Sequence, residues 1–177
     1  MSVTSIDLSG GKSALSSGLF LTANLKKGEN LFQVTLSDER IFINSFFKIG
    51  KTGLSFGPSV GYFKNVPFLA VIGTFRPFGS KYFSTFHWGG YSFGQPDGMV
   101  SINPTFLFAV NTANIDLWRL RGSYSIICFQ KLPVKHVVSL RYTQTITDSF
   151  MAYTDIGYDI TNKIQLLKVG LVYKFKR

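Results

Sequence analysis

Apolar and polar residues alternate along most of this chain, which is the pattern of β-strands whose two faces meet different surroundings. The pattern is clearest over residues 166–177, where one face carries Lys168, Gly170 and Lys174. The other face of this segment is apolar and consists of Leu167, Val169, Leu171, Tyr173 and Phe175. Because no turn signal follows, we expect this last strand to pair with the first one.

Similar segments recur at intervals of about 12 to 16 residues, separated by Gly-rich and polar turn clusters. In the segment 100–111, the residues expected on the apolar outward face are Val100, Ile102, Phe106, Phe108 and Val110. Residues 67–75 and 82–94 are apolar on both faces, so their direction stays open. Roughly eleven strands result, and residues 2–8 supply a twelfth. With no amphipathic helix or linker, residues 1–177 read as one all-β domain.

The direction of the apolar face distinguishes a soluble barrel from a membrane barrel. The polar face is mostly Ser, Thr, Gly and Asn, whereas a soluble surface carries more Lys and Glu. Charged residues make up 16% of the chain and acidic residues number 9, against about 25% charged in soluble domains. We therefore predict a single closed antiparallel transmembrane β-barrel of roughly 10–12 strands, 12 favoured, with short turns. The aromatic residues expected to form its interfacial girdles are Phe32, Tyr62, Trp118, Phe150, Tyr173 and Phe175.

The segment KVGLVYKF near the end of the chain resembles the C-terminal assembly signal of outer-membrane β-barrel proteins. That signal runs polar, any, Gly, two of any, hydrophobic, any, aromatic. Lys168, Gly170, Tyr173 and Phe175 match it in order. The resemblance implies that barrel-assembly machinery reads this strand, and that the strand closes the barrel. Two basic residues follow the aromatic one and residues 1–17 lack the apolar core of a signal peptide, so a mitochondrial or plastid outer membrane stays open beside the favoured bacterial one.

The formal net charge of +10 predicts anionic partners. If the polar face lines the lumen, Asp155 and Asp159 are the inward acids, and inward Phe20, Phe46 and Tyr153 narrow the bore. The basic residues expected to face the lumen and its anions are Lys48, Arg119, Arg121, Lys135, Arg141, Lys168 and Lys174.

Two hairpin turns, at TDS and TNK, determine which of these charges meet. They place Arg141 near Asp155 and bring Lys168 diagonally beside it, so we expect a lumen ion-pair row of these three residues. The inward cations without an obvious partner, and hence the best candidates for contact with solutes, are Arg119 and Arg121.

The predicted function is a narrow, anion-preferring passive channel for small solutes, with no chemistry. Its expected partners are the lipid bilayer, detergent or lipid molecules, barrel-assembly machinery and small anionic solutes. A soluble calyx-type β-barrel that binds a hydrophobic ligand and an outer-membrane lipid-modifying enzyme are the alternatives. A structural barrel without transport is a third.

Metal, cofactor and catalytic chemistry have little support in the sequence. A single Cys128 and two histidines argue against a zinc cluster, and we expect no metal and no cofactor. A catalytic triad would have to assemble across strands from His87, a serine and Asp97, since only Thr85 and Gly89 share the face of His87. We therefore expect no catalytic residue. Nucleic acid is not expected either, because the cations lie opposite the aromatic residues.

Overall fold

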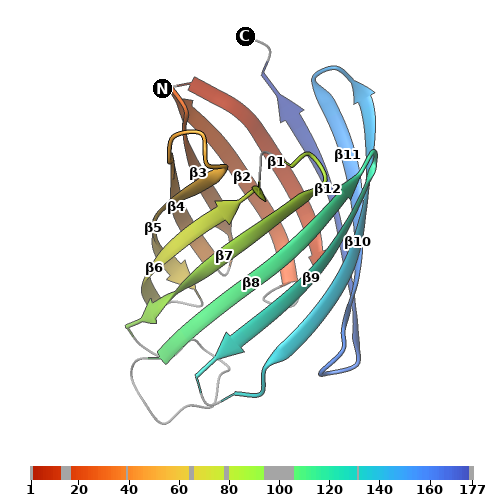
Figure 1. Ribbon diagram of the computed structural model, residues 1–177. Coiled ribbons are helices and arrows are strands. Elements are labelled where there is room, and N and C mark those ends of the chain that lie inside the picture. Colours follow the sequence, from red (N-terminus) through yellow and green to blue (C-terminus); the bar gives the residue numbers. More distant parts are fainter. Residues whose placement is uncertain are drawn as a thin grey trace.

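Twelve strands form one sheet that closes on itself, with neighbours antiparallel and β1 paired with β12 (Figure 1). The prediction of a closed antiparallel barrel with 12 strands is confirmed. This computed structural model describes residues 2–12, 17–38, 40–63, 66–77, 80–93, 106–130 and 132–175. The strands are β1 (Ser2–Lys12), β2 (Ser17–Lys27), β3 (Asn30–Ser37), β4 (Arg40–Lys48), β5 (Leu54–Phe63), β6 (Val66–Phe75), β7 (Phe83–Ser92), β8 (Phe106–Leu117), β9 (Leu120–Phe129), β10 (Lys135–Thr147), β11 (Phe150–Asp159) and β12 (Ile164–Lys174).

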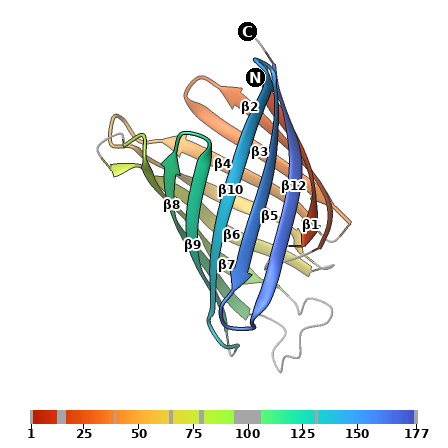
Figure 2. The same ribbon diagram turned by 90° about the vertical axis from the view of Figure 1, so that its right-hand side faces the viewer.

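The two ends of the barrel differ in their connections, and both views show strands inclined to the barrel axis (Figures 1 and 2). We call the end where β1 begins and β12 ends the turn end. It carries tight turns, including Gly28 and Glu29 between β2 and β3, with φ 60° at Gly28. Glycine adopts this left-handed conformation at little cost. The opposite end, which we call the loop end, carries the longest connection, between β7 and β8.

The outward face of the wall is apolar over most of its described surface. Leu19, Val71 and Ile156 are 63%, 62% and 62% exposed. On β12, Leu167 is exposed, whereas the next residue, Lys168, points into the barrel and lies over two inward rings. A soluble calyx would need these apolar rows inside, so their outward direction argues against that alternative.

An apolar cluster nevertheless fills part of the interior in the loop-end half. Phe68, Phe108 and Leu166 are buried, and each is the third residue of its strand counted from the loop end. The apolar cluster, as we use the term, comprises Phe42, Phe68, Ala70, Phe86, Trp88, Phe108, Val110, Ile127, Phe129, Val137 and Leu166. This cluster settles the open direction of β6, because Phe68 and Ala70 face inward while the residues that alternate with them face outward.

The predicted outward direction of Phe108 and Val110 is wrong. Both residues are buried, whereas Leu107, which precedes Phe108 on β8, is 46% exposed on the outer face. The segment FLFAV is apolar at successive positions, so alternation could not determine its facing. The register with β7 places Val110 opposite Trp88, and both side chains join the apolar cluster. The members of the same predicted row that lie outside the described residues are Val100 and Ile102.

Candidate functional site in the lumen

Two cavities lie in the turn-end half of the lumen and share Arg121. The first, of about 290 Å³, is lined by Asp7, Arg141 and Tyr153, among others. The second, of about 320 Å³, is lined by Arg76 and by threonine, serine and asparagine side chains. The second cavity therefore combines neutral hydrogen-bonding groups with guanidinium groups, which suits small anionic or polar solutes. The first cavity has guanidinium groups together with the carboxylates of Asp7 and Asp116, so its positive charge is partly balanced.

The strand register places five charged residues in one row across the lumen wall. Arg141 donates to Asp155 from Nη2 at 2.8 Å and from Nε at 3.2 Å. Arg121 donates to both carboxylate oxygens of Asp116. From β8 to β12, each residue directly opposite the next, the row is Asp116, Arg121, Arg141, Asp155 and Lys168. The structure thus brings together the three residues of the expected ion-pair row, although Lys168 forms no salt bridge with any described residue.

Aromatic rings lie between the cations of this wall. The Phe20 ring centroid is 5.0 Å from Cζ of Arg40 and 5.6 Å from Nζ of Lys168. The Tyr153 ring centroid is 5.8 Å from Nζ of Lys168 and 4.4 Å from Cζ of Arg141. Cation–π attraction of this kind helps to hold the cations in place along the wall. We call this series the cation–aromatic ladder: Arg40, Phe20, Lys168, Tyr153 and Arg141.

A chain of side-chain hydrogen bonds crosses another part of the wall, from β1 to β7. Ser59 donates to Oδ1 of Asn44 at 2.6 Å, and Nε1 of Trp88 donates to Oγ of Ser59 at 3.0 Å. In order, the chain is Ser5, Asn24, Gln33, Asn44, Ser59 and Trp88. These groups satisfy one another, so this side of the lumen is a structural support that also fixes Trp88 within the apolar cluster.

Four predicted lumen cations lie at the rims of the barrel. Lys48 ends β4 and donates to Oε1 of Glu29 at 2.7 Å. This hydrogen bond and the charge of Lys48 lower the pKa of Glu29. Arg119, in the turn between β8 and β9, donates to Oε1 of Gln144 at 3.0 Å. The other two, at the first residue of β10 and the last residue of β12, are Lys135 and Lys174.

The expectation that Arg119 and Arg121 lack partners is wrong. Arg121 is held by Asp116, and Cζ of Arg119 lies 4.5 Å from the ring centroid of Trp118. Trp118, one of the predicted girdle residues, lies in a turn with φ 51°. Strand β8 therefore extends to Leu117, and Asp116 faces Arg121 across the hairpin.

The lumen residues of the site that were missed in the sequence are Asp7, Arg40, Arg76 and Asp116. Arg40 directly precedes the alternating segment 41–49 and shares the face of Asn44 and Lys48, so extending this alternation by one residue would have found it. Asp7 shares a face with Ser9 in β1 and accepts a hydrogen bond from the Tyr153 hydroxyl at 3.1 Å. The weak pattern at the start of the chain gave no sign of this contact.

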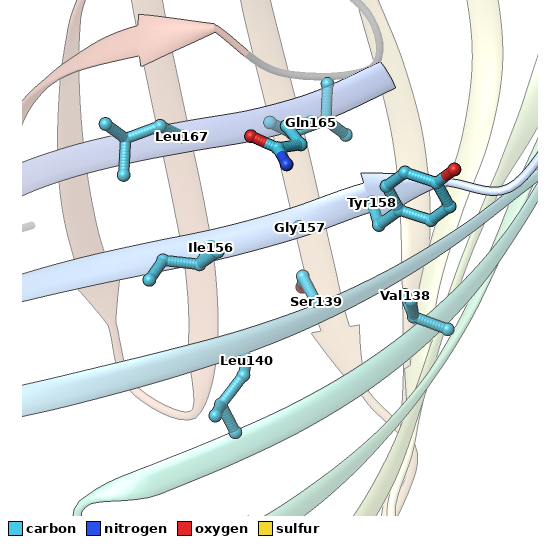
Figure 3. A pocket seen from close by; sticks show the side chains of 9 residues that line it. Val138, Ser139, Leu140, Ile156, Gly157, Tyr158, Gln165 and Leu167 are labelled. Carbon is cyan, nitrogen blue, oxygen red and sulfur yellow. The ribbon is translucent and has the colours of Figure 1, made fainter. Parts of the chain in front are cut away.

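A third hollow, of about 840 Å³, lies on the outside of the wall over β10, β11 and β12. Figure 3 shows Leu140, Ile156 and Leu167 on neighbouring strands, with Gly157 between larger residues. These three side chains are 53%, 62% and 51% exposed, and each lies directly opposite the next. This outer groove is apolar, so it suits a hydrocarbon chain rather than a polar solute.

Thr85, His87 and Asn111 form a hydrogen-bonded trio on the outward face of β7 and β8. The ring nitrogens of His87 lie 2.8 Å from Oδ1 of Asn111 and 2.9 Å from Oγ1 of Thr85. This order of hydroxyl, imidazole and amide is that of a hydrolase relay. However, β7 is paired on both sides, so its backbone N–H groups bond within the sheet and offer no oxyanion site. Asp97, considered as a triad member, lies outside the described residues.

Within the described ranges, no group of three or more His, Cys, Asp or Glu side chains could hold a metal ion. No helix in the same part of the chain has the length and hydropathy to cross a membrane.

Comparison with solved structures finds this barrel fold in a porin. The structure described as "KdgM porin" has a TM-score of 0.65 and 11% sequence identity, covering 97% of this chain and 99% of that chain. The structure "KdgM porin in complex with disordered oligogalacturonate" has a TM-score of 0.64, 12% identity and the same coverage. No protein-family model and no curated protein sequence matches this chain. The likeness shows that the chain has the fold of this porin.

Proposed function

We propose that this chain is an outer-membrane β-barrel, with a bacterial outer membrane as the favoured location. The exposed apolar rows would then meet lipid, and aromatic residues would lie at both membrane surfaces. At the turn end, Tyr82 and Trp118 are 63% and 92% exposed. At the loop end, Tyr91 and Phe93 are 47% and 57% exposed.

The last strand is our candidate for recognition by the barrel-assembly machinery. Tyr173 and Phe175 are both exposed on the outward face, with ring centroids 4.9 Å apart. Gly170 lies opposite Tyr153, and a Cβ at this position would come within 2.5 Å of the Tyr153 ring. The glycine of the signal-like segment KVGLVYKF thus also has a packing role, because it makes room for a ring of the cation–aromatic ladder.

We propose that the barrel is a narrow, passive channel that prefers small anionic solutes. The observation that carries this proposal is Lys168, an inward ammonium group held between the rings of Phe20 and Tyr153 and without a salt bridge to any carboxylate in the described part of the chain. Arg40 and Arg141 extend the positive charge to either side along the ladder. Because the barrel wall has a low dielectric constant, these charges act strongly on ions in the narrow lumen.

The ladder also supports a more specific substrate class, namely acidic saccharides. Aromatic faces pack against the apolar faces of sugar rings, and ammonium or guanidinium groups bind carboxylates. Phe20 and Tyr153 supply the faces, while Lys168 and Arg141 supply the cations. The porin with the same fold was solved with an oligogalacturonate, which is an acidic saccharide.

We further propose that the apolar cluster controls passage through the loop-end half. Trp88 and Phe108 ring centroids lie 4.6 Å apart, and Phe42 and Phe68 centroids lie 5.1 Å apart, so rings from β4 to β8 pack into the lumen. A narrow apolar constriction resists ions by losing its water. Movement of these rings would therefore switch the channel between low and high conductance.

Reversal potentials in planar bilayers test the proposed function. In a KCl gradient, discrete conductance steps should reverse at a potential that favours chloride. Lys168→Gln should lower the anion preference, whereas Lys48→Gln at the rim, where the ammonium group is paired with Glu29, should change it little. A cation-selective wild-type pore would contradict the assignment of the lumen. Equal effects of the two variants would show that Lys168 has no special role in anion preference.

A further inference from the structure

The trio of Thr85, His87 and Asn111 lies at mid-height on the outward wall. His87 is the fifth of the ten residues of β7, and Asn111 lies directly opposite it on β8. Along β7, the exposed residues Phe83 and Tyr91 lie four residues before and four residues after His87. In the proposed membrane, the trio would therefore lie close to the bilayer centre, midway between two aromatic positions.

Polar side chains at this depth need hydrogen-bond partners that lipid does not provide. Both ring nitrogens of His87 are satisfied within the trio, as is Oδ1 of Asn111. The amide nitrogen of Asn111 has no hydrogen bond to any described residue, so its N–H donors point to a partner outside the barrel. A hydrocarbon chain, which suits the outer groove at Leu140, could not accept them.

The residues around the trio are small, so the outer surface of the barrel is recessed here. Gly73 lies opposite His87 on β6, and Ala113 lies opposite Thr85 on β8. In the next row towards the loop end, Gly89 lies opposite Ala109. We call the surface formed by Gly73, Thr85, His87, Gly89, Ala109, Asn111 and Ala113 the polar patch. Small residues allow two membrane walls to approach closely, so that polar groups can meet.

We propose that the polar patch is the contact surface for a second copy of this chain. A two-fold axis perpendicular to the membrane brings each patch against itself, at the same depth and with the same orientation in the bilayer. Oδ1 of Asn111 keeps a second lone pair beside the one that His87 uses, so it can accept from the amide nitrogen of the other copy, and the amides of two copies can pair. In a second copy the polar patch lies at the same depth in the bilayer, so its Asn111 is at the right height. Any other protein would need its own hydrogen-bond acceptor in the middle of the membrane. The inference rests on the proposed membrane location and is independent of anion transport.

Cys128 provides a native reporter for this contact. It is the free cysteine of the described chain, on β9 opposite Ala109, and therefore borders the polar patch. Two copies that join through their patches bring their Cys128 thiols within reach of a short bifunctional reagent.

The test uses the full chain in lipid vesicles, with flotation and heat-modifiable gel migration confirming insertion first. A short bis-maleimide should convert the wild type to a covalent dimer, and Cys128→Ser should abolish this product. His87→Leu with Asn111→Leu should lower the dimer fraction by about tenfold at equal protein-to-lipid ratio. This double variant replaces polar with apolar side chains on the lipid face, so the barrel itself should fold at least as well as the wild type.

Matched controls separate a specific contact from random collision. Thr154→Leu makes a similar change on the outward face of β11 and should leave the cross-linking unchanged. A cysteine at Leu140 in the Cys128→Ser background reports on the far wall and should give only collisional product, whereas a cysteine at Ala113 should cross-link. Equal yields at Leu140 and Ala113, or a dimer fraction unaffected by the His87 and Asn111 substitutions, would overturn the proposal. Single-barrel conductance would remain in either case, so failure here differs from failure of the proposed channel.

Discussion

Asp155→Asn is the substitution that tests the electrostatics of the lumen most sharply. It removes the negative charge that lies 2.8 Å from Nη2 of Arg141 and opposite Lys168, while the asparagine keeps the size of the side chain. Both members of the Arg141–Asp155 pair are partly accessible, at 29% and 19% side-chain exposure. The unpaired Arg141 can therefore be solvated, and we expect the barrel to stay folded.

The magnitude follows from the distance at which a passing ion meets this charge. At about 6 Å and an effective dielectric constant of about 80, one unit charge changes the energy of an ion by about 0.7 kcal/mol. The same charge acts with opposite sign on an anion and on a cation, so the two energies differ by about 1.4 kcal/mol after its removal. Because about 1.4 kcal/mol is tenfold in an equilibrium, the anion-to-cation permeability ratio should rise about tenfold. Lys168→Gln should lower the ratio by about the same factor.

Reversal potentials across a KCl gradient, recorded near 0.1 M salt, measure this ratio. The Debye length is about 10 Å at that concentration, and the effect should shrink at about 1 M, where it is about 3 Å. The double variant Asp155→Asn with Lys168→Gln restores the net charge of the row and should return the ratio close to the wild-type value. Selectivity that moves in the same direction in both single variants, or not at all, would refute the reasoning.

Three further predictions concern the apolar cluster, the last strand and the turn-end rim. Phe68→Ala should raise single-channel conductance by opening the loop-end half of the lumen. It should also lower the free energy of unfolding by about 3–5 kcal/mol, as measured by urea titration of gel migration. An unchanged conductance would show that the apolar cluster does not lie on the permeation path. Gly170→Ala should displace the Tyr153 ring, since the new Cβ would lie within 2.5 Å of it, and should reduce anion preference and refolding yield together, with Gly10→Ala, where a Cβ meets ordinary contacts at 3.6 Å, as the control. Because Lys48 lowers the pKa of Glu29 below its usual 4.5, the small stabilisation from this exposed pair is present above 4.5 and is lost as the pH falls through the lowered value. The loss of stability in acid, measured by urea titration of gel migration, should therefore be smaller in Glu29→Gln than in the wild type.

Strict alternation of polar and apolar residues was enough to predict the barrel. In β12, Leu167 and Lys168 have opposite surroundings, and one face is exposed and apolar, as the pattern indicates. Hairpin turns with clear polar residues also determined the register, which is why the sequence alone predicts the pairing of Arg141 with Asp155. The number of strands followed from the recurrence of the turns.

The apolar cluster could not be predicted in the same way. Where both faces of a strand are apolar, as around Phe108, alternation carries no information, and only the register with neighbouring strands decides the direction. The partner of Arg121 was missed for a related reason, because a single turn residue, Trp118, shifts the end of β8 and thereby places Asp116 in the hairpin. The contact of Asp7 with Tyr153 joins the two ends of the chain and depends on barrel closure.

In the proposed barrel, successive residues of one strand meet lipid and water in turn. In the Cys128→Ser background, Lys168→Cys and Leu167→Cys place a thiol on opposite faces of β12, one residue apart. A membrane-impermeant, charged thiol reagent added to the reconstituted barrel should react with the cysteine at 168 and change the current, and should leave the cysteine at 167 unmodified. Rapid modification at 167 with none at 168 would contradict the account.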